Sequence, residues 1–126
     1  MIDTCPCGSS SSYNNCCGLY IDNNKNLPET AEHLMRSRYT AYSLANIDYI
    51  YQTMRGTARK GFSKKQALDW ASTVEWQRLE IISSTENTVE FKAYYQYQGQ
   101  NEVLHEHSQF EKKNGKWFYT GQIQEL

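Results

Sequence analysis

Two spacings of apolar residues divide this chain into a helical part and a stranded part. From about residue 29 to residue 73, apolar side chains recur every three or four positions, which is the spacing of one helix face. From about residue 74 onward they alternate with polar side chains, as in strands that bury one face. Helices followed by an antiparallel run of strands predict an α+β fold with the helices packed on one face of the sheet.

The longest helix is expected over residues 29–45. Pro28 suits the start of a helix, and Glu29 and Glu32 favour the positive end of its dipole. The helix would present one apolar face, formed by Ala31, Leu34, Met35, the aliphatic stem of Arg38, Tyr39, Tyr42 and Ala45.

Two shorter helices should follow. Asn46 or Asp48 can cap the second helix, and Ser63 with Gln66 forms a capping box for the third. A loop over residues 56–61, bounded by glycines, separates them. The second helix would bury Ile47, Ile50, Tyr51 and Met54, and the third would run through Ala67, Leu68 and Ala71.

The alternating part predicts a meander of about four antiparallel strands. Their expected ranges are 74–83, 88–98, 102–112 and 116–124. The dipeptide Asn114-Gly115, between the last two strands, is favoured in tight hairpin turns.

Length and charge limit the kinds of function. A chain of 126 residues can form one domain with a core and a small appendage. A net charge of −1 provides no field that would hold nucleic acid or anionic lipid, and no apolar run approaches the length of a membrane span. The first residues contain neither a basic segment nor an apolar run, so we expect a cytoplasmic protein.

All four cysteines lie within the first seventeen residues. Four thiolates can supply the tetrahedral sulfur shell that Zn²⁺ prefers. Two disulfides are the alternative, but they would close trivially small loops, and a bond between adjacent cysteines would be strained. We therefore expect one zinc ion per chain, bound by Cys5, Cys7, Cys16 and Cys17. A closed shell of four thiolates leaves no position for water, so this zinc would be structural.

The sequence around these cysteines resembles a known zinc motif. Cys5-Pro6-Cys7-Gly8-Ser9, then Tyr13 and then Cys16-Cys17-Gly18 are similar to the SEC-C motif, first named from the tail of the bacterial preprotein translocase motor. Four further segments resemble the YchJ-type family of uncharacterised bacterial proteins, namely residues 28–32, 34–42, 106–110 and 117–119.

This resemblance implies a specific architecture. Residues 1–24 would be the SEC-C zinc knuckle and its linker, which includes the polar stretch from Asp22 to Asn26. Residues 25–126 would form a cone-shaped domain like that of nuclear transport factor two (NTF2), also described as cystatin-like. In such a domain, N-terminal helices pack on a curved antiparallel sheet around a pocket.

The chain departs from the family pattern at three places. Many relatives carry a second SEC-C motif near the C-terminus, whereas this sequence has no cysteine after Cys17. The usual arginine after the strand glutamate is His107 here. Ser11, Ser12 and Asn14 occupy positions that are lysines in the translocase tail. Because those positive charges are absent, we do not expect nucleic acid or a ribosome as a partner.

Seven residues are candidates for lining the implied pocket: Tyr39, Tyr42, Trp76, Tyr95, Glu106, Phe110 and Trp117. The aromatic ones could stack on a planar ligand or form an ordinary core. Glu106 lies between Leu104 and Phe110 on the apolar face of its strand, so its carboxylate needs a partner or has a raised pKa. It could pair with Arg36 or Arg38 and lock helix to sheet, or it could act as an acid or base.

Two other polar groups have both a functional and an ordinary interpretation. His105 and His107 share the opposite strand face and could bind a second metal, although a solvated polar face is the simpler interpretation. The segment from Arg55 to Lys65 holds five basic residues, which could meet an acidic partner or RNA, or could form a solvated loop.

Three classes of function follow from these features. We expect a non-catalytic binding or adaptor module, in which the knuckle holds structural zinc and contacts a protein partner. The alternative is a small-molecule-binding protein or enzyme that uses the pocket around Glu106, although no nucleophile or phosphate loop is recognisable. The third possibility is a structural knuckle on a domain that forms a homodimer through its sheet.

Overall fold

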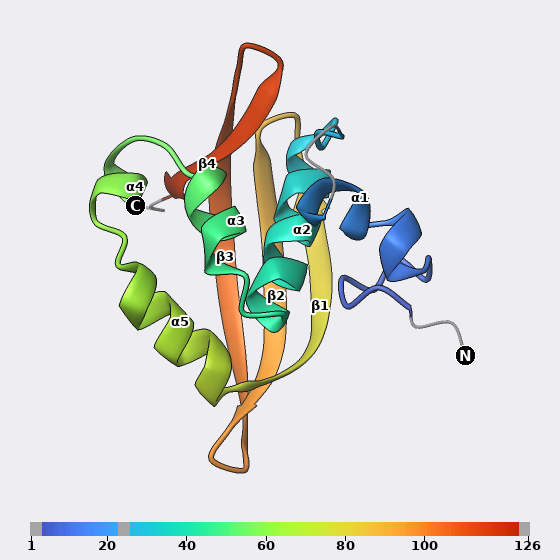
Figure 1. The fold of residues 1–126 in the computed structure, drawn as a ribbon, viewed down its shortest axis with the longest axis vertical. Coiled ribbons are helices and arrows are strands. Elements are labelled where there is room, and N and C mark those ends of the chain that lie inside the picture. Colours follow the sequence, from blue (N-terminus) through green and yellow to red (C-terminus); the bar gives the residue numbers. More distant parts are fainter. Residues whose placement is uncertain (1–3, 23–25, 124–126) are drawn as a thin grey trace.

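The computed structural model of the protein describes residues 4–22 and 26–123. Four antiparallel strands form one sheet in the order β1-β2-β3-β4, and helices cover one of its faces (Figure 1). The predicted α+β fold with four strands is confirmed. The strands are β1 (Glu75–Ser84), β2 (Thr88–Tyr97), β3 (Gln100–Lys113) and β4 (Lys116–Gln122).

The three predicted helices are present, and each begins at a side-chain cap. They are α2 (Ala31–Ser43), α3 (Ile47–Gln52) and α5 (Lys64–Thr73). Thr30 caps α2, and Ser63 caps α5 by accepting from the backbone N–H of Gln66. Asn46, rather than Asp48, caps α3. Each cap satisfies a backbone N–H that has no partner within its helix.

Short helical segments also form where the sequence predicted none. They are η1 (Tyr13–Asn15), α1 (Gly18–Ile21) and α4 (Thr57–Lys60). The helix α4 lies within the segment that was expected to be a loop, so that expectation is corrected. The guanidinium of Arg59 stacks 4.3 Å from the ring centre of Tyr51, and this contact holds the turn against α3.

Helix α2 is the central element of the core. Leu34, Met35 and Thr40 of α2 are buried. Val89 and Phe91 of β2 are buried as well. The helix contacts α1 as well as three strands of the sheet. Because it packs on two sides, α2 buries polar as well as apolar residues, and Thr40 has no exposed surface.

The sheet is curved by irregularities in its edge strand. The pairing of β1 with β2 has register shifts between Trp76 and Arg78 and between Ile81 and Ser83. Such bulges bend and twist a strand. The predicted hairpin turn is present, because Asn114 and Gly115 both have positive φ angles, of 53° and 79°.

Some predicted boundaries fall outside the described residues. These are most of the linker after Asp22, the division of the chain at residues 24 and 25, and the predicted strand end at residue 124. Among the helices that are described, none has the combination of length and apolar character needed to cross a bilayer.

Candidate functional site

The fold brings the four cysteines together in one cluster. Their Sγ atoms all lie within 4.8 Å of one another, and those of Cys7 and Cys16 are 3.6 Å apart. A tetrahedral shell with Zn–S bonds of about 2.3 Å places its sulfurs about 3.8 Å apart. No disulfide joins the four cysteines, which are all free thiols. The cluster therefore fits a metal ion with four sulfur ligands.

Two glycines of the motif have structural reasons to be glycine. Gly8 has a φ of +84° in the turn where its N–H donates to the carbonyl of Cys5 at 3.1 Å. Gly18 packs so tightly on η1 that a Cβ atom would lie 2.7 Å from the carbonyl oxygen of Tyr13. These two positions let the segment fold back and bring both pairs of cysteines to one point.

Side chains around the cluster donate toward its sulfurs and backbone. The Thr40 hydroxyl lies 3.3 Å from Cys17 Sγ and donates to it, and the Ser9 hydroxyl lies 3.0 Å from Cys16 Sγ. Arg36 Nη1 donates to the backbone carbonyl of Cys7 at 2.8 Å. Such outer partners orient metal ligands and stabilise their charge. Because Thr40 and Arg36 belong to α2, the longest helix supports the cluster directly.

The thiols of the cluster cannot all ionise easily without a cation. The hydrogen bond between Cys7 and Cys17 is the largest influence on both, and it lowers the pKa of Cys7 while raising that of Cys17. Burial raises the pKa of the Cys16 thiol. Four thiolates at this spacing would repel one another, and a divalent ion would offset that repulsion. The donor set thus suits a sulfur-binding divalent metal.

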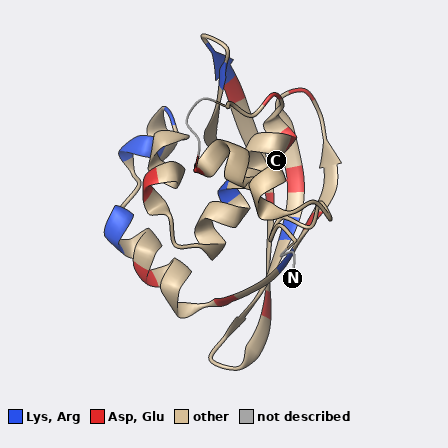
Figure 2. Cartoon of the chain, turned by 45° about the vertical axis from the view of Figure 1, so that its right-hand side comes forward, with Lys and Arg blue, Asp and Glu red and all other residues tan. Residues whose placement is uncertain are grey.

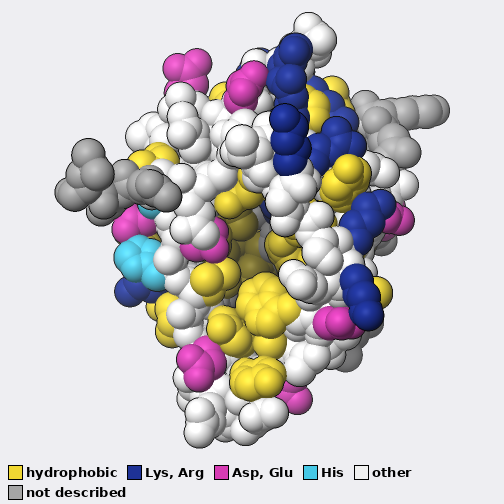
Figure 3. Space-filling view, turned by 90° about the vertical axis from the view of Figure 1, so that its left-hand side faces the viewer, with side chains coloured by type: hydrophobic (Ala, Val, Ile, Leu, Met, Phe, Trp, Pro, Cys, Tyr) yellow, Lys and Arg dark blue, Asp and Glu magenta, His cyan; other side chains and the backbone are white. Residues whose placement is uncertain are grey.

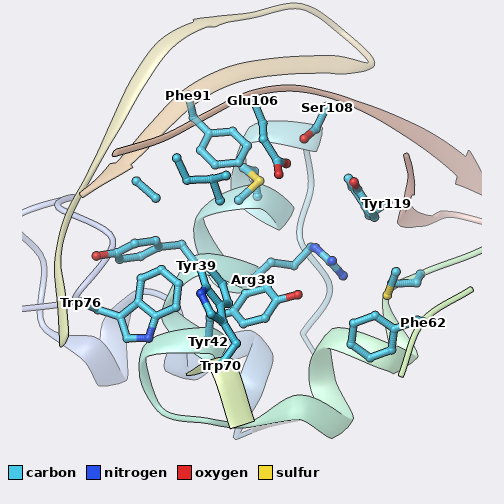
Figure 4. A pocket seen from close by; sticks show the side chains of 14 residues that line it. Arg38, Tyr39, Tyr42, Phe62, Trp70, Trp76, Phe91, Glu106, Ser108 and Tyr119 are labelled. Carbon is cyan, nitrogen blue, oxygen red and sulfur yellow. The ribbon is translucent and has the colours of Figure 1, made fainter. Parts of the chain in front are cut away.

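A separate cavity of about 320 Å³ lies between the helices and the concave face of the sheet. Its mouth is a hollow floored by hydrophobic side chains (Figure 3). Four of the predicted pocket residues line it: Tyr39 and Tyr42 from α2, Trp76 from β1 and Glu106 from β3. Figure 4 shows them around the space, with the sheet on one side and the helices on the other.

Three predicted pocket residues lie outside this lining. Tyr95 contacts Trp70 edge-on, with their ring centres 5.6 Å apart, but does not line the cavity. Phe110 is deep in the core and only 2% exposed. Trp117 faces the start of α2, where its indole N–H donates to the carbonyl of Glu29 at 3.1 Å. The alternation of polar and apolar residues correctly predicts on which face of a strand a side chain lies. It does not predict at which point along the strand the cavity opens.

The cavity also contains residues outside the seven predicted ones. Arg38 and Ser108 contribute polar groups, and Phe62, Trp70 and Tyr119 contribute rings. For two of them, the sequence contains a signal that indicates a place in the cavity. Arg38 precedes Tyr42 by one helical turn, and Ser108 follows Glu106 by two residues on a strand, so each shares a face with a predicted pocket residue.

Glu106 is half-buried in the cavity wall. Burial raises the pKa of its carboxyl group, and the positive charge of Arg38 and the hydroxyl of Ser108 offset part of that rise. Its Oε1 accepts a hydrogen bond from Gln122 Nε2 at 3.0 Å. Ser108 Oγ is fully buried, and although it is close enough to influence Glu106, it meets the geometry of a hydrogen bond with no described residue.

The ion pairs considered for Glu106 do not form among the described residues. Arg36 pairs with Glu32, with Nε 3.0 Å from Oε2. Arg38 instead points into the cavity and donates from Nη1 to the carbonyl of Ile50 and to the Thr53 hydroxyl, at 2.9 and 2.6 Å. The contact between α2 and the sheet is therefore made without a direct salt bridge to Glu106.

His105 and His107 of β3 lie on the outer face of the sheet. His105 Nε2 lies 2.8 Å from Glu90 Oε2, and both side chains face solvent. The hydrogen bond from His105 lowers the pKa of Glu90. Among the described residues, the cysteine cluster is the one group of three or more potential ligands close enough to hold a metal.

The basic segment gathers on α4 and the start of α5 (Figure 2). Part of it is engaged within the protein: Lys64 pairs with Asp48 at 3.2 Å, and Arg55 pairs with an exposed glutamate of β3 at 3.1 Å. Arg55, Arg59 and Lys60 line an open depression that shares Phe62 with the cavity. The basic segment is thus next to the cavity mouth.

Comparisons with known families and sequences give consistent matches. Residues 30–122 match a family described as YchJ, middle NTF2-like domain. A UPF0225 protein from Geobacter sulfurreducens is 38% identical over 127 residues, which cover 95% of this chain and 78% of that protein. A UPF0225 protein from Haemophilus influenzae is 40% identical over 125 residues, with coverages of 94% and 76%.

Solved structures agree with this fold. A SEC-C motif containing protein from Rhodopseudomonas palustris matches with a TM-score of 0.84 and 33% identity, over 94% of this chain and 96% of that one. A SEC-C motif containing protein from Psychrobacter arcticus matches with a TM-score of 0.80 and 29% identity, over 99% and 85%.

Proposed function

The chain belongs to the YchJ family, whose curated relatives are called UPF0225 proteins, and we propose from its cysteine cluster and its cavity that it is a non-catalytic binding protein with two separate sites. Cys5, Cys7, Cys16 and Cys17 hold one structural Zn²⁺ per chain. The cavity of the NTF2-like domain receives a small molecule.

The surroundings of the cysteines support a structural role for the zinc. Cys5, Cys7 and Cys17 are buried and belong to the same hydrophobic cluster as Leu34 and Leu79 of the larger domain. Four thiolates complete a tetrahedral shell, so no position stays open for a substrate or a reactive water. The metal would tie the N-terminal segment to α2 and β1. Contact with a protein partner through the knuckle stays a prediction.

The observation that carries the ligand-binding role is an unsatisfied polar group inside the cavity. Ser108 Oγ is buried without a hydrogen-bonding partner among the described residues, and such a group normally costs about 1–3 kcal/mol. A ligand that bonded to it would recover part of this cost. The cavity of about 320 Å³ is within the range of small-molecule sites, and it combines many apolar walls with a few polar groups.

The same geometry favours binding over catalysis. A serine nucleophile needs a well-aligned hydrogen bond to its base, and Ser108 Oγ, although close to Glu106, does not meet that geometry. Glu106 could act as an acid or base, but the hydrogen bond that it accepts comes from the side-chain amide of Gln122, which is neither a nucleophile nor a proton donor for catalysis.

Two adjacent strand residues provide a test of the cavity. Leu104 lines the cavity, whereas Val103 is 50% exposed on the other face of β3. Leu104→Phe should fill part of the space, and Val103→Phe adds the same ring outside it. The assay would measure the melting temperature and the Trp70 and Trp76 fluorescence against neutral, anionic and cationic phenyl compounds.

We expect at least one compound to stabilise the wild-type protein and the Val103→Phe variant, and Leu104→Phe to lose that response. A panel that leaves all three proteins unchanged, or a response that Leu104→Phe retains in full, would contradict the proposed ligand-binding role.

A further inference from the structure

Arg38 is a charged side chain buried in the wall of the cavity. It is only 4% exposed, and its guanidinium points into the space from the helical side (Figure 4). An arginine stays protonated even when burial lowers its pKa. The cavity therefore contains a permanent positive charge that is shielded from water.

This charge has no direct counter-ion among the described residues. Both hydrogen bonds of Arg38 come from Nη1 and go to neutral acceptors, the Ile50 carbonyl and the Thr53 hydroxyl. No Arg38 nitrogen lies within 4.0 Å of a carboxylate oxygen of a described residue. Buried charges in proteins are normally paired, because removing an ion from water is costly. The guanidinium also lies 4.6 Å from the ring centre of Tyr119, a contact that favours the cation without neutralising it. Arg38 thus lacks an anionic partner among the described residues and provides a site for one.

Glu106 does not fill that role in the described structure. It stands on the sheet side of the cavity and accepts a hydrogen bond from Gln122 at 3.0 Å. It influences Arg38 only at longer range, since the two make no ion pair. The free space lies between these two walls, so a ligand could reach Arg38 without displacing a salt bridge.

The rest of the site suits a flat apolar body attached to the anion. Tyr42, Trp70 and Trp76 form a contiguous set of rings, with centres 4.9–6.0 Å apart. These rings lie beside Arg38 in the cavity lining. Such surfaces bury large apolar area at little cost in flexibility.

One side of the cavity mouth has the same sign of charge as Arg38. Lys and Arg side chains lie along one side of the hollow (Figure 3). Arg55, Arg59 and Lys60 line the depression that adjoins the cavity at Phe62. A concentration of positive charge at an opening raises the local concentration of anions and speeds their entry.

We infer that the cavity selects a small ring-bearing carboxylate, with the acid group bound by Arg38 and the ring held against Trp70 and Trp76. This inference rests on the proposed function, because it names the chemical class of the ligand for that cavity. An amine held by Glu106 within the aromatic rings is the opposing arrangement. It is disfavoured because the cation would lie in the same cavity as the buried charge of Arg38.

Three compounds that differ in one group test this inference on the wild-type protein. They are 3-phenylpropionate, its neutral amide 3-phenylpropanamide, and the cation 3-phenylpropylamine. Isothermal titration calorimetry at neutral pH should give the carboxylate at least tenfold higher affinity than the amide, and the weakest binding for the amine. Equal binding of carboxylate and amide, or tighter binding of the amine, would overturn the inference while leaving the cavity a binding site.

Three variants test whether Arg38 causes the preference for the carboxylate. Arg38→Gln should bring the carboxylate and the amide to equal affinity. Because Arg38 also ties α2 to α3, Arg38→Lys is a second variant, and it should keep a preference for the carboxylate by keeping the charge. Arg78→Gln removes an exposed arginine that stacks on Tyr94 outside the cavity, and it should leave the preference unchanged. An Arg38→Gln variant that folds and still prefers the carboxylate tenfold would overturn the assignment.

Discussion

Removing the hydroxyl of Thr40 should weaken zinc binding without disturbing the ligands themselves. Thr40 is fully buried in α2, and its Oγ1 lies 3.3 Å from Cys17 Sγ and 3.7 Å from Cys5 Sγ. Its single proton can donate to one sulfur at a time. Thr40→Val keeps the shape of the side chain and removes that donor.

The expected size of the effect follows from one hydrogen bond to a charged atom. Such a bond contributes about 1.5–3 kcal/mol. At about 1.4 kcal/mol for each factor of ten, the loss corresponds to a roughly ten- to hundredfold weaker zinc affinity. The same range is typical when an outer partner of a metal ligand is removed.

The assay is a competition between the protein and a chromophoric chelator for Zn²⁺ under reducing conditions. Thr40→Ser is the matched control, because it keeps the hydroxyl and loses only a methyl group. It should bind zinc within a few-fold of the wild-type affinity. A Thr40→Val variant that binds zinc as tightly as wild type, or a Thr40→Ser variant as weak as Thr40→Val, would refute the role given to this hydroxyl.

The remaining predictions concern one glycine and two cavity residues. Gly18→Ala should lower the free energy of unfolding by about 1–3 kcal/mol in urea titrations, because its Cβ would meet a carbonyl oxygen at 2.7 Å. Gly61→Ala is the control, because the nearest contact of its Cβ would be at 3.7 Å. Equal effects of the two variants would contradict the packing argument. Ser108→Ala should stabilise the ligand-free protein by up to about 1 kcal/mol, whereas a loss of that size would show that the hydroxyl is satisfied. Burial raises the pKa of Glu106 despite the facing charge of Arg38, so folding favours the protonated carboxyl group. The free energy of unfolding should therefore fall as pH rises from the unfolded-state pKa through the folded-state pKa of Glu106. Glu106→Gln, which cannot ionise, should be less pH-dependent than wild type in acidic urea titrations and more stable near neutral pH; identical pH profiles would contradict this.

Local sequence signals predicted most of the elements. Helix α2 was predicted because its buried positions recur at helical spacing, although it begins at Ala31 after the Thr30 cap and not at residue 29. The β3–β4 hairpin was predicted because Asn114-Gly115 accepts positive φ. The helix α4 was missed because its flanking glycines and basic residues are typical of a loop. A tertiary contact supports it, the stacking of Arg59 on Tyr51, and local patterns do not contain such contacts.

The two sites differ in how far they could be predicted. The cysteine cluster is formed by residues close in sequence, so its spacing and turn glycines indicate the arrangement directly. The cavity is formed by helices and strands distant in sequence. Alternation placed Glu106 on the inner face, but whether Arg38 would pair with it depended on the separation of helix and sheet. That separation is set by packing of the whole core.

The most direct test of the central claim is native mass spectrometry of the protein purified under reducing conditions without added metal. The account predicts one zinc ion per chain, released by acid, with four free thiols left on the apoprotein. Protein that contains no zinc, with a mass lower by four hydrogens, would show two disulfides in place of the metal and would contradict the account.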